Sequence, residues 1–353
     1  MRLEDESKIV PAIRITDTTN IIKEAAFVDP KKKYNMCSRC VMDTTDPKIY
    51  FNSKNECSHC QYFDKFISEK IFENKNRYKE IKKIIKQIKS YGRNKKYDCI
   101  IGLSGGADSS FVAYKIHNWG LNPLVVHVDA GWNSELAVKN IENICKKLKL
   151  DLVTHIVNWE DIKNLQIAFL KSGVINQDTP QDHAYFAALY HYAVKSNIKY
   201  IISGGNFATE SILPTAWGYD AMDATHIKYI SKTFSKEKLN NFPIINFFSY
   251  FINYPFIRKM KVIRPLDYIN YNKEEAIKTL QREFDWKSYS GKHYESQWTK
   301  FFQGYYLPYK FGYDKRKAHL SSLILSNQIS REDAIKELKK DIFEDKNLID
   351  EKE

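Results

Sequence analysis

The sequence predicts an α/β protein with a doubly wound parallel sheet, preceded by a small cysteine-bearing module and followed by a helical region. Three observations support this fold class. Short apolar runs alternate with helical patterns across the middle of the chain, two C-x-x-C pairs precede them, and the patterns after residue 262 are helical. Strands that alternate with helices of ten or more residues favour a parallel sheet with right-handed crossovers.

The overall composition sets few limits on function. The 353 residues are 43% apolar and 14% aromatic, and they carry a formal charge of +12. This charge would attract nucleotides, nucleic acid or anionic lipid, and because it is spread over many lysines it does not choose among them. Met1 is followed by acidic and mixed residues rather than by a signal peptide. We therefore expect a cytoplasmic protein without a transmembrane segment.

The amino-terminal part divides into three segments. Residues 1–35 are polar and lack periodicity, so we expect an N-terminal extension that is either disordered or packed on a partner. Residues 36–66 hold the two cysteine pairs in a compact module, and 67–96 form a helical linker. Within the linker, isoleucines recur at helical spacing over 78–91, which predicts an amphipathic helix.

The central domain covers residues 97–262 and the C-terminal helical substrate region covers 263–353. Apolar runs predict four strands, at 97–103, 123–128, 152–157 and 200–203. Helical patterns join them and recur in the last region, at 109–118, 134–148, 181–196, 272–283, 293–304 and 330–340.

An apolar stretch at 242–257 interrupts this pattern. It contains two prolines and two asparagines, and it is too short to span a bilayer. We expect a buried or lid-like insertion, with a membrane-surface patch as the alternative.

Four cysteines predict a structural metal site. Cys37 and Cys40 form one C-x-x-C pair, Cys57 and Cys60 form the other, and a sixteen-residue loop separates them. Each pair can direct two thiolates at one point, and four thiolates make the closed tetrahedral shell that zinc accepts. An iron–sulfur cluster is the alternative. A closed shell leaves no position for a substrate, so we assign Zn²⁺ a structural role, with His59 outside the shell.

A glycine-rich turn predicts a phosphate site. Residues 101–110 (IGLSGGADSS) follow a predicted strand and open a helix, and the absence of a lysine before the hydroxyl residue excludes a Walker A loop. Glycines let backbone N–H groups approach an anion at the positive end of the helix. Ser104 and Ser109 can donate to phosphate oxygens. Asp108 would be repelled by phosphate unless a cation such as Mg²⁺ lies between them.

The motif S-G-G-x-D-S resembles that of the PP-loop ATP pyrophosphatases, which have an adenine-nucleotide α-hydrolase-like fold and cleave ATP between the α and β phosphates. The resemblance implies that the loop holds pyrophosphate through Ser104, Gly105, Gly106, Asp108 and Ser109. It places His127 and Asp129 near the nucleoside, with Gly204 and Asn206 in a G-x-N stretch of the ATP site. It also implies catalytic roles for Ser104, Asp108 and Glu210, the two carboxylates as Mg²⁺ ligands, although Glu210 lies one residue farther from Asn206 than in the family pattern.

Over about residues 36–345 the chain further resembles the N-acetyl sugar amidotransferases of surface-polysaccharide synthesis, including those of pseudaminic- or legionaminic-type sugars. The resemblance rests on the block MCSRCVMDTT at 36–45 with its second C-x-x-C pair, on the PP-loop that follows, and on the string KHYESQWTKFFQGYYLPYKFGYDKRKAHLSS at 292–322. It implies that an acetamido group on a nucleotide-linked or nonulosonic sugar becomes an acetamidino group. AMP would be transferred to the amide oxygen, after which ammonia displaces it, in lipopolysaccharide O-antigen, capsule or flagellin glycan synthesis.

Candidate sugar-binding residues combine aromatic faces, carboxylates and basic groups. They are Trp217, Tyr219, Asp220, Asp223, His226, His293, Glu295, Lys315 and Arg316, with a packed loop or a solvated face as the alternative. Neither Cys99 nor Cys145 lies in a nucleophile elbow. We therefore expect ammonia from a separate class-I-type glutaminase subunit or from solution, and no nucleic-acid partner.

Two other function classes remain as alternatives. A PP-loop enzyme that modifies tRNA, such as a thiolase, would share the loop and the metal module, but no second cysteine pair follows residue 60. A zinc-ribbon nucleic-acid binder with a degenerate ATP domain would not need the intact Ser104, Asp108 and Ser109.

Overall fold

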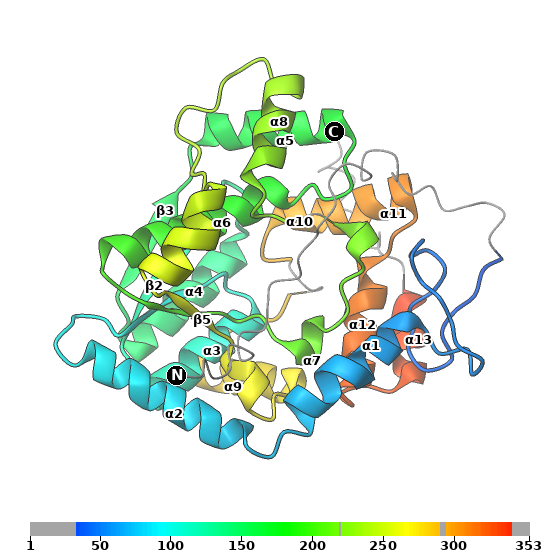
Figure 1. Ribbon diagram of the computed structural model, residues 1–353, viewed down its shortest axis with the longest axis horizontal. Helices are drawn as coiled ribbons and strands as arrows, with labels where there is room; N and C mark the ends of the chain where they lie inside the picture. Colours follow the sequence, from blue (N-terminus) through cyan, green and yellow to red (C-terminus); the bar gives the residue numbers. More distant parts are fainter. Residues whose placement is uncertain (1–32, 219, 290–293, 341–353) are drawn as a thin grey trace, which may run out of the picture.

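The computed structural model describes residues 33–218, 220–289 and 294–340. Its centre is a five-stranded parallel sheet with the strand order β3-β2-β1-β4-β5 (Figure 1). The strands are β1 Cys99–Gly102, β2 Pro123–Asp129, β3 Leu152–Ile156, β4 Tyr200–Ile202 and β5 Lys261–Ile263. The order reverses between β1 and β4, so the carboxyl ends of these two strands flank the crevice in which such sheets bind ligands.

Helices cover both faces of the sheet and build the carboxyl-terminal part. Their bounds are α1 Ser58–Tyr62, α2 Arg77–Gly92, α3 Ala107–Asn118, α4 Glu135–Leu148, α5 Trp159–Ser172, α6 Thr179–Lys195, α7 Phe207–Glu210, α8 Ala224–Phe234, α9 Lys273–Phe284, α10 Gln297–Phe301, α11 Leu307–Phe311, α12 Lys315–Leu325 and α13 Arg331–Leu338. Further helical segments are Phe63–Phe72, Thr215–Trp217, Ser249–Ile257, Pro265–Tyr268 and Phe302–Tyr306.

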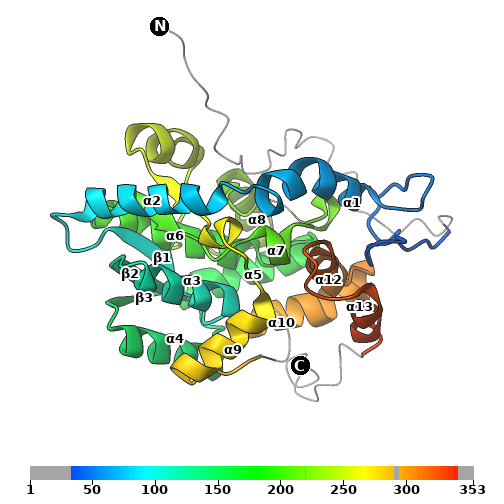
Figure 2. The ribbon, with the colours of Figure 1, turned by 90° about the horizontal axis from the view of Figure 1, so that it is seen from below.

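The strands alternate between two cores because successive side chains of a strand point to opposite faces. On β1, Cys99 and Ile101 are buried with residues of α3, α4 and α9, whereas Ile100 is buried with residues of α6. Figure 2 shows α3 and α4 on the side of the sheet opposite α6. Both faces are thus covered, which confirms the predicted doubly wound sheet.

The structure confirms the four predicted strands, and it adds β5, α5, α8 and α12, which the patterns did not predict. The three residues of β5 are too few to produce a periodic signal, and the strand exists because Ile201 pairs with Val262 at the edge of the sheet. The predicted helix at 293–304 begins at Gln297 and continues as a further turn from Phe302.

The region after residue 262 packs on two different parts of the chain. Helix α9 contributes Leu280 and Phe284 to the core beneath α3 and α4. Helix α12 contributes Ala318 and Leu325 to a second core that contains the four cysteines of the amino-terminal module. Figure 1 accordingly shows α1 beside α12 and α13, although most of the chain separates them.

The apolar stretch 242–257 is only partly buried, which corrects the expectation of a buried insertion. Phe242 and Ile245 lie in the cores, but no residue of the helix Ser249–Ile257 is buried. The helix packs on α6 through two tyrosines, Tyr250 and Tyr254, whose rings lie against Tyr190. None of the helices in the described part of the chain is long and apolar enough to cross a membrane.

Candidate functional site

The turn between β1 and α3 is held in its conformation by the residues behind it. Gly105 has φ +84°, and a methyl group there would lie 2.7 Å from the carbonyl oxygen of Ala137, so only glycine fits without strain. The Gly105 carbonyl accepts hydrogen bonds from Trp286 Nε1 at 2.9 Å and from the Tyr289 hydroxyl at 3.1 Å. Gly105 in the predicted phosphate loop is therefore held between Ala137 and the side chains of Trp286 and Tyr289.

A carboxylate lies over this turn where an anion would bind. The Ser104 hydroxyl lies 3.1 Å from the Ser109 hydroxyl and donates to Glu295 Oε1 at 3.4 Å. A methyl group added at Gly106 would lie only 2.5 Å from the same Glu295 oxygen. A carboxylate oxygen is chemically similar to a phosphate oxygen, so Glu295 marks the position at which the turn can accept one.

Asp108 is fixed by two hydroxyl donors that the sequence analysis did not identify. The Tyr271 hydroxyl donates to Asp108 Oδ1, and the Thr209 hydroxyl donates to Oδ2 at 3.3 Å. Burial and the charge of Asp108 raise the pKa of Tyr271 above its usual range, so the phenol stays protonated and remains a donor. Glu210 adds to the same shift, which places both predicted Mg²⁺ ligands within electrostatic range of one phenol.

The short helix α7 places Glu210 beside the turn. Asn206 accepts a hydrogen bond from the Thr209 N–H at 2.9 Å and so caps α7. Gly204 lies against α3, since a methyl group there would be 2.9 Å from the Ser109 nitrogen. A methyl group at Gly205 would lie 3.7 Å from Glu210 Oε2, so this carboxylate is directed back toward the segment that joins β4 to α7.

The oxygen donors of this site fit a hard divalent cation. Asp108 and Glu210 are carboxylates near the predicted phosphate loop, and Mg²⁺ is commonly held by one or two carboxylates together with phosphate oxygens. Such an ion would reduce the repulsion between Asp108 and a bound phosphate.

The end of β2 is organised around a neutral histidine. His127 is buried, and its Nδ1 donates to the Leu103 carbonyl at 3.2 Å while its Nε2 accepts from Asn133 Nδ2 at 3.2 Å. Burial lowers the pKa of His127, which keeps the ring neutral and matches this tautomer. Asn133 also donates to Asp129 Oδ1 at 3.1 Å. His127 thus links Leu103, at the start of the turn after β1, to Asn133. Asp129 remains partly exposed at the carboxyl end of β2.

The candidate sugar residues around α8 serve local structure. Trp217 is only 1% exposed and stacks on Tyr313 with ring centroids 5.2 Å apart. Asp223 caps α8 by accepting from the N–H groups of Thr225 and His226. In the preceding turn, the Asp220 side chain accepts from the Met222 N–H at 2.9 Å. The His226 ring lies edge-on to Phe169 at 5.7 Å.

The two remaining basic candidates, Lys315 and Arg316, lie at the start of α12. Arg316 is bound to Asp314 at 2.8 Å and to the backbone carbonyl of Lys340 at 2.9 Å, so it joins α12 to the end of α13. Lys315, one residue earlier, extends over the Phe302 ring at 5.7 Å. The predicted residues Tyr219 and His293 lie outside the described residues.

A carboxylate on α6, Asp182, lies within electrostatic range of Glu210 on α7 and Lys315 on α12. Burial raises the pKa of Asp182 above its usual value, the neighbouring Asp178 and Glu210 raise it further, and Lys315 lowers it. Asp182 lies within the first turn of α6, after a proline. Asp182 was not predicted as a site residue, because the sequence T-P-Q-D is typical of a helix start. An acidic residue at that position usually only complements the helix dipole.

The four predicted metal ligands are brought together. Three of the Sγ–Sγ distances are 3.6 Å (Cys40–Cys57), 3.7 Å (Cys57–Cys60) and 3.8 Å (Cys37–Cys60). Four sulfurs at about 2.3 Å from one ion would be separated by about 3.8 Å, the edge of that tetrahedron. A four-iron cluster, whose irons and sulfides occupy the centre, needs its thiolates farther apart. The donor set therefore fits a single tetrahedral ion, and His59 is paired with Asp46 at 2.7 Å instead.

The cysteine module binds α12 and α13, and α12 in turn contacts α7, which carries Glu210. Arg331, at the start of α13, donates to the carbonyls of Cys40 at 3.0 Å and Cys37 at 2.9 Å. On α12, Lys317 forms a buried ion pair with Asp43. Helix α12 also contacts α7, because its His319 Nδ1 donates to the Thr209 carbonyl at 3.0 Å. The cysteines are thereby connected to α7 through a single helix.

Comparison with known protein families finds two models that match this chain. The model "NAD synthase" matches residues 78–245, and "LPS biosynthesis protein WbpG-like, C-terminal domain" matches residues 295–353. Among curated proteins, an uncharacterized protein of Methanocaldococcus jannaschii is 34% identical over 120 residues, or 33% of this chain and 41% of its own length. A tRNA-specific 2-thiouridylase (MnmA 2) of Fusobacterium nucleatum is 31% identical over 113 residues, or 30% of this chain. The chain spans 41% and 32% of the lengths of these two relatives.

Comparison with solved structures gives matches of low overall similarity. An NH3-dependent NAD synthetase from Campylobacter jejuni matches with a TM-score of 0.30 and 18% identity, over 44% of this chain and 72% of its own. The U34-tRNA thiolase NcsA of Methanococcus maripaludis, with its [4Fe-4S] cluster, matches with a TM-score of 0.34 and 13% identity, over 88% and 89% of the two chains.

Proposed function

We propose that this chain, which joins a PP-loop domain of the NAD synthase family to a WbpG-like C-terminal domain, is an ATP-dependent amidotransferase acting on an N-acetyl sugar. It would convert the acetamido group of a nucleotide-linked or nonulosonic sugar to an acetamidino group during lipopolysaccharide O-antigen, capsule or flagellin glycan synthesis. One observation carries the proposal. In the turn between β1 and α3 the Ser104 and Ser109 hydroxyls lie 3.1 Å apart, and the hydroxyls of Tyr271 and Thr209 hold the Asp108 carboxylate beside them.

The reaction balances without a protein nucleophile. The amide oxygen of the sugar attacks the α phosphorus of ATP, the bond between the α phosphorus and the bridging oxygen breaks, and pyrophosphate leaves. Ammonia then adds to the resulting imidate carbon, AMP departs with the former amide oxygen, and loss of a proton leaves the amidine. An amide is a poor electrophile, so alignment of the oxygen with the α phosphorus is the main task of the protein, and such positioning can lower a barrier by about 7–11 kcal/mol.

The loop residues would divide the work on ATP. Ser104, Ser109 and the backbone at Gly106 would bind the β and γ phosphates once Glu295 moves aside. Asp108 and Glu210 would hold Mg²⁺, which supplies positive charge to the departing pyrophosphate. Tyr271 and Thr209 keep the Asp108 carboxylate oriented for that role.

Ammonia would come from a separate glutaminase subunit or from solution. Cys99 is fully buried in β1, and burial raises the pKa of Cys145 to about 12, so neither thiol has the properties of a glutaminase nucleophile. We place the reaction in the cytoplasm, where ATP and glutamine are available. The four cysteines would hold Zn²⁺ as a structural ion.

A tRNA-modifying enzyme is the second candidate, because the curated thiouridylase is 31% identical over 113 residues of this chain. The buried positions of Cys99 and Cys145 favour the amidotransferase, since thiolation commonly uses accessible cysteines.

The deciding experiment is mass spectrometry of acetamido sugars and their nucleotide conjugates incubated with the protein, ATP, Mg²⁺ and ammonium. We expect AMP and pyrophosphate in equal amounts, together with the small mass loss that accompanies exchange of O for NH. Parallel reactions with glutamine and a class-I-type glutaminase in place of ammonium test the ammonia source. Formation of ADP and orthophosphate, or sulfur incorporation into tRNA with no change in any sugar, would rule the proposal out.

Asp182 is expected to act as the base that removes a proton from ammonium or from the adduct. A carboxylate whose pKa is raised toward neutrality is a better base than an ordinary one, and it must be ionised to accept a proton. The rate should therefore rise with pH through the raised pKa of Asp182. In Asp182→Asn we expect kcat to fall about 10²–10⁴-fold and this limb of the pH profile to disappear.

The matched control is Glu160→Gln on the outer side of α5, where Glu160 only pairs with Lys163 at 2.7 Å. This variant should retain both kcat and the pH profile. An Asp182→Asn enzyme with an unchanged acidic limb would show that another group titrates there.

A further inference from the structure

A group of large apolar side chains stands in solvent on one side of the molecule. We call this group the phenylalanine face, and its members are Phe247, Phe248, Phe251, Phe256 and Ile257. Phe247, Phe256 and Ile257 are 68%, 70% and 63% exposed. Scattered apolar residues are normal on a protein surface, but here the Phe247 and Phe251 rings lie 4.7 Å apart, and clustered exposed apolar side chains commonly mark an interaction site.

The phenylalanine face is carried by an ordered helix. In Ser249–Ile257, Tyr250 and Tyr254 pack on Tyr190 of α6, and the Tyr190 and Tyr254 rings stack 4.5 Å apart with an angle of 6° between them. Asn246 caps the helix by accepting from the Ser249 N–H at 2.8 Å. Figure 1 shows this yellow-green helix next to α6. Tyr250 and Tyr254 attach one side of the helix to α6. The phenylalanines on the other side are therefore exposed to solvent.

The chain segment that carries this face has basic side chains and no acidic ones. No aspartate or glutamate occurs in the sequence between Glu237 and Asp267. Lysines and arginines occur there at five positions, Lys238, Arg258, Lys259, Lys261 and Arg264. Three of them, Arg258, Lys259 and Lys261, directly follow the phenylalanine face and are exposed. Aromatic side chains beside clustered cations are the chemistry that binds an anionic lipid surface.

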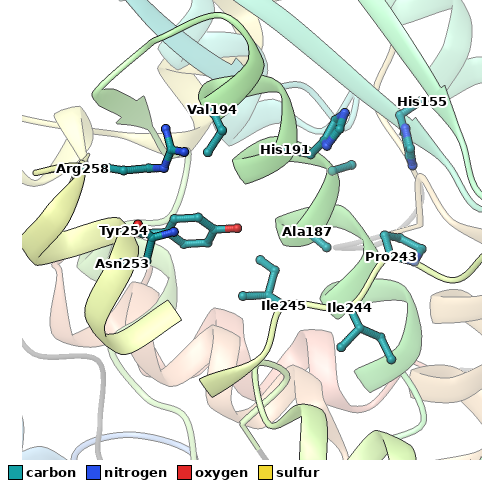
Figure 3. A pocket seen from close by; sticks show the side chains of 11 residues that line it. His155, Ala187, His191, Val194, Pro243, Ile244, Ile245, Asn253, Tyr254 and Arg258 are labelled. Atoms are coloured by element: carbon teal, nitrogen blue, oxygen red, sulfur yellow. The ribbon is translucent and has the colours of Figure 1, made fainter. Parts of the chain in front are cut away.

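A cavity of about 330 Å³ adjoins the same helix. Figure 3 shows Arg258 at one end of this cavity and His155 and His191 at the other, with Tyr254 between them. Among the described residues that line it, none is a carboxylate. The cavity thus offers a guanidinium and two imidazoles to an anionic group that approaches beside the phenylalanine face.

We propose that the helix Ser249–Ile257 docks this protein on the surface of an anionic lipid bilayer. The phenylalanines enter the boundary between headgroups and acyl chains, Lys259 and Lys261 bind the charged surface, and Arg258 contacts a lipid phosphate at the mouth of the cavity. The protein lies on the membrane and does not span it.

The charge favours lipid over a second copy of the chain. In a two-fold interface each patch meets itself, so Arg258, Lys259 and Lys261 would face the same cations of the other copy. The acidic partners that would relieve this repulsion are missing from the segment between Glu237 and Asp267. An anionic bilayer instead complements the apolar and the cationic parts together.

The test is co-sedimentation of the full chain with vesicles of phosphatidylglycerol and phosphatidylethanolamine, and with vesicles of phosphatidylcholine alone. We expect binding to the anionic vesicles at least tenfold stronger than to the neutral ones, weakening as salt is raised. The double variant Phe247→Ser/Phe256→Ser should lose at least tenfold in partitioning to anionic vesicles. Lys259→Gln/Lys261→Gln should lose most of the preference for anionic lipid.

Tyr309→Ser is the matched control, because Tyr309 is an exposed aromatic residue on α11, away from this face. It should bind vesicles like the unmodified chain. Equal binding to both kinds of vesicle, or an unchanged double variant, would overturn the proposal. So would light scattering that shows a dimer of the unmodified chain which the double variant converts to a monomer, because the phenylalanine face would then be an interface between copies.

Discussion

Replacing Asp108 with asparagine is expected to lower the rate of AMP and pyrophosphate formation by about 10²–10³-fold or more, as loss of a single preorganised electrostatic contact does in other active sites. The side chains are nearly the same size, but the amide has one acceptor oxygen, so it can accept from only one of the hydroxyls of Tyr271 and Thr209. The neutral amide, however, cannot hold a divalent cation against the phosphates as a carboxylate does. The rate is measured by pyrophosphate release, and the thermal midpoint of unfolding should change little.

Asp151→Asn is the control for this experiment. Asp151 lies at the surface and pairs with Lys96 at 3.0 Å, so the variant removes the same charge from the chain without touching the loop. It should retain full activity. If Asp108→Asn were also fully active at low Mg²⁺ concentration, the carboxylate would not be a ligand of the ion, and the assignment of the turn as a nucleotide site would lose its chemical basis.

Replacing Cys57 with serine is expected to have the largest effect on stability. The thiolate is one of four that surround a single point, and loss of a metal is among the few changes that cost roughly 4 kcal/mol or more. The metal content should fall from one zinc per chain to almost none, and the unfolding midpoint should drop. Activity should fall as well, because the module holds α12 through Arg331 and Lys317, and α12 holds α7.

The measurement is elemental analysis of the purified chain together with calorimetry. Cys145→Ala serves as control, because this buried cysteine lies on α4 outside the cluster and its replacement should cost about 1 kcal/mol. The control should keep its zinc. Iron and sulfide in place of zinc would contradict the assignment of the ion, and a Cys57→Ser chain with unchanged stability would show that the module is not a structural support.

The parts of the fold that depend on short-range patterns could be predicted. The strands of 97–103 and 123–128 are continuous apolar runs, and the helices after them have regular apolar spacing, so β1, β2, α3 and α4 followed from periodicity. The two cysteine pairs and the S-G-G-x-D-S turn carry their chemistry within a few residues. Local spacing was therefore sufficient to predict both these elements and the two motifs.

The polar groups around the turn could not be predicted, because they come from positions far apart in the chain. Tyr271 lies 163 residues after Asp108, and Glu295 lies 191 residues after Ser104. No spacing rule connects such residues, and they meet only because α9 packs beneath α3 and the segment at 295–297 pairs with residues 132–134. For the same reason the sequence could not show that Trp217, a candidate sugar-binding residue, is buried against Tyr313.

By itself the sequence determined most of the elements, the glycine-rich turn between β1 and α3 and the two cysteine pairs, because each of these depends on residues that are neighbours in the chain. Only the tertiary structure decided which side chains surround Asp108, how the cysteine module supports α7, and which apolar residues remain outside. Burial is a property of the whole packed molecule, and α6 can cover only one side of the helix Ser249–Ile257. Tyr250 and Tyr254 occupy that side, so the phenylalanines are left in solvent.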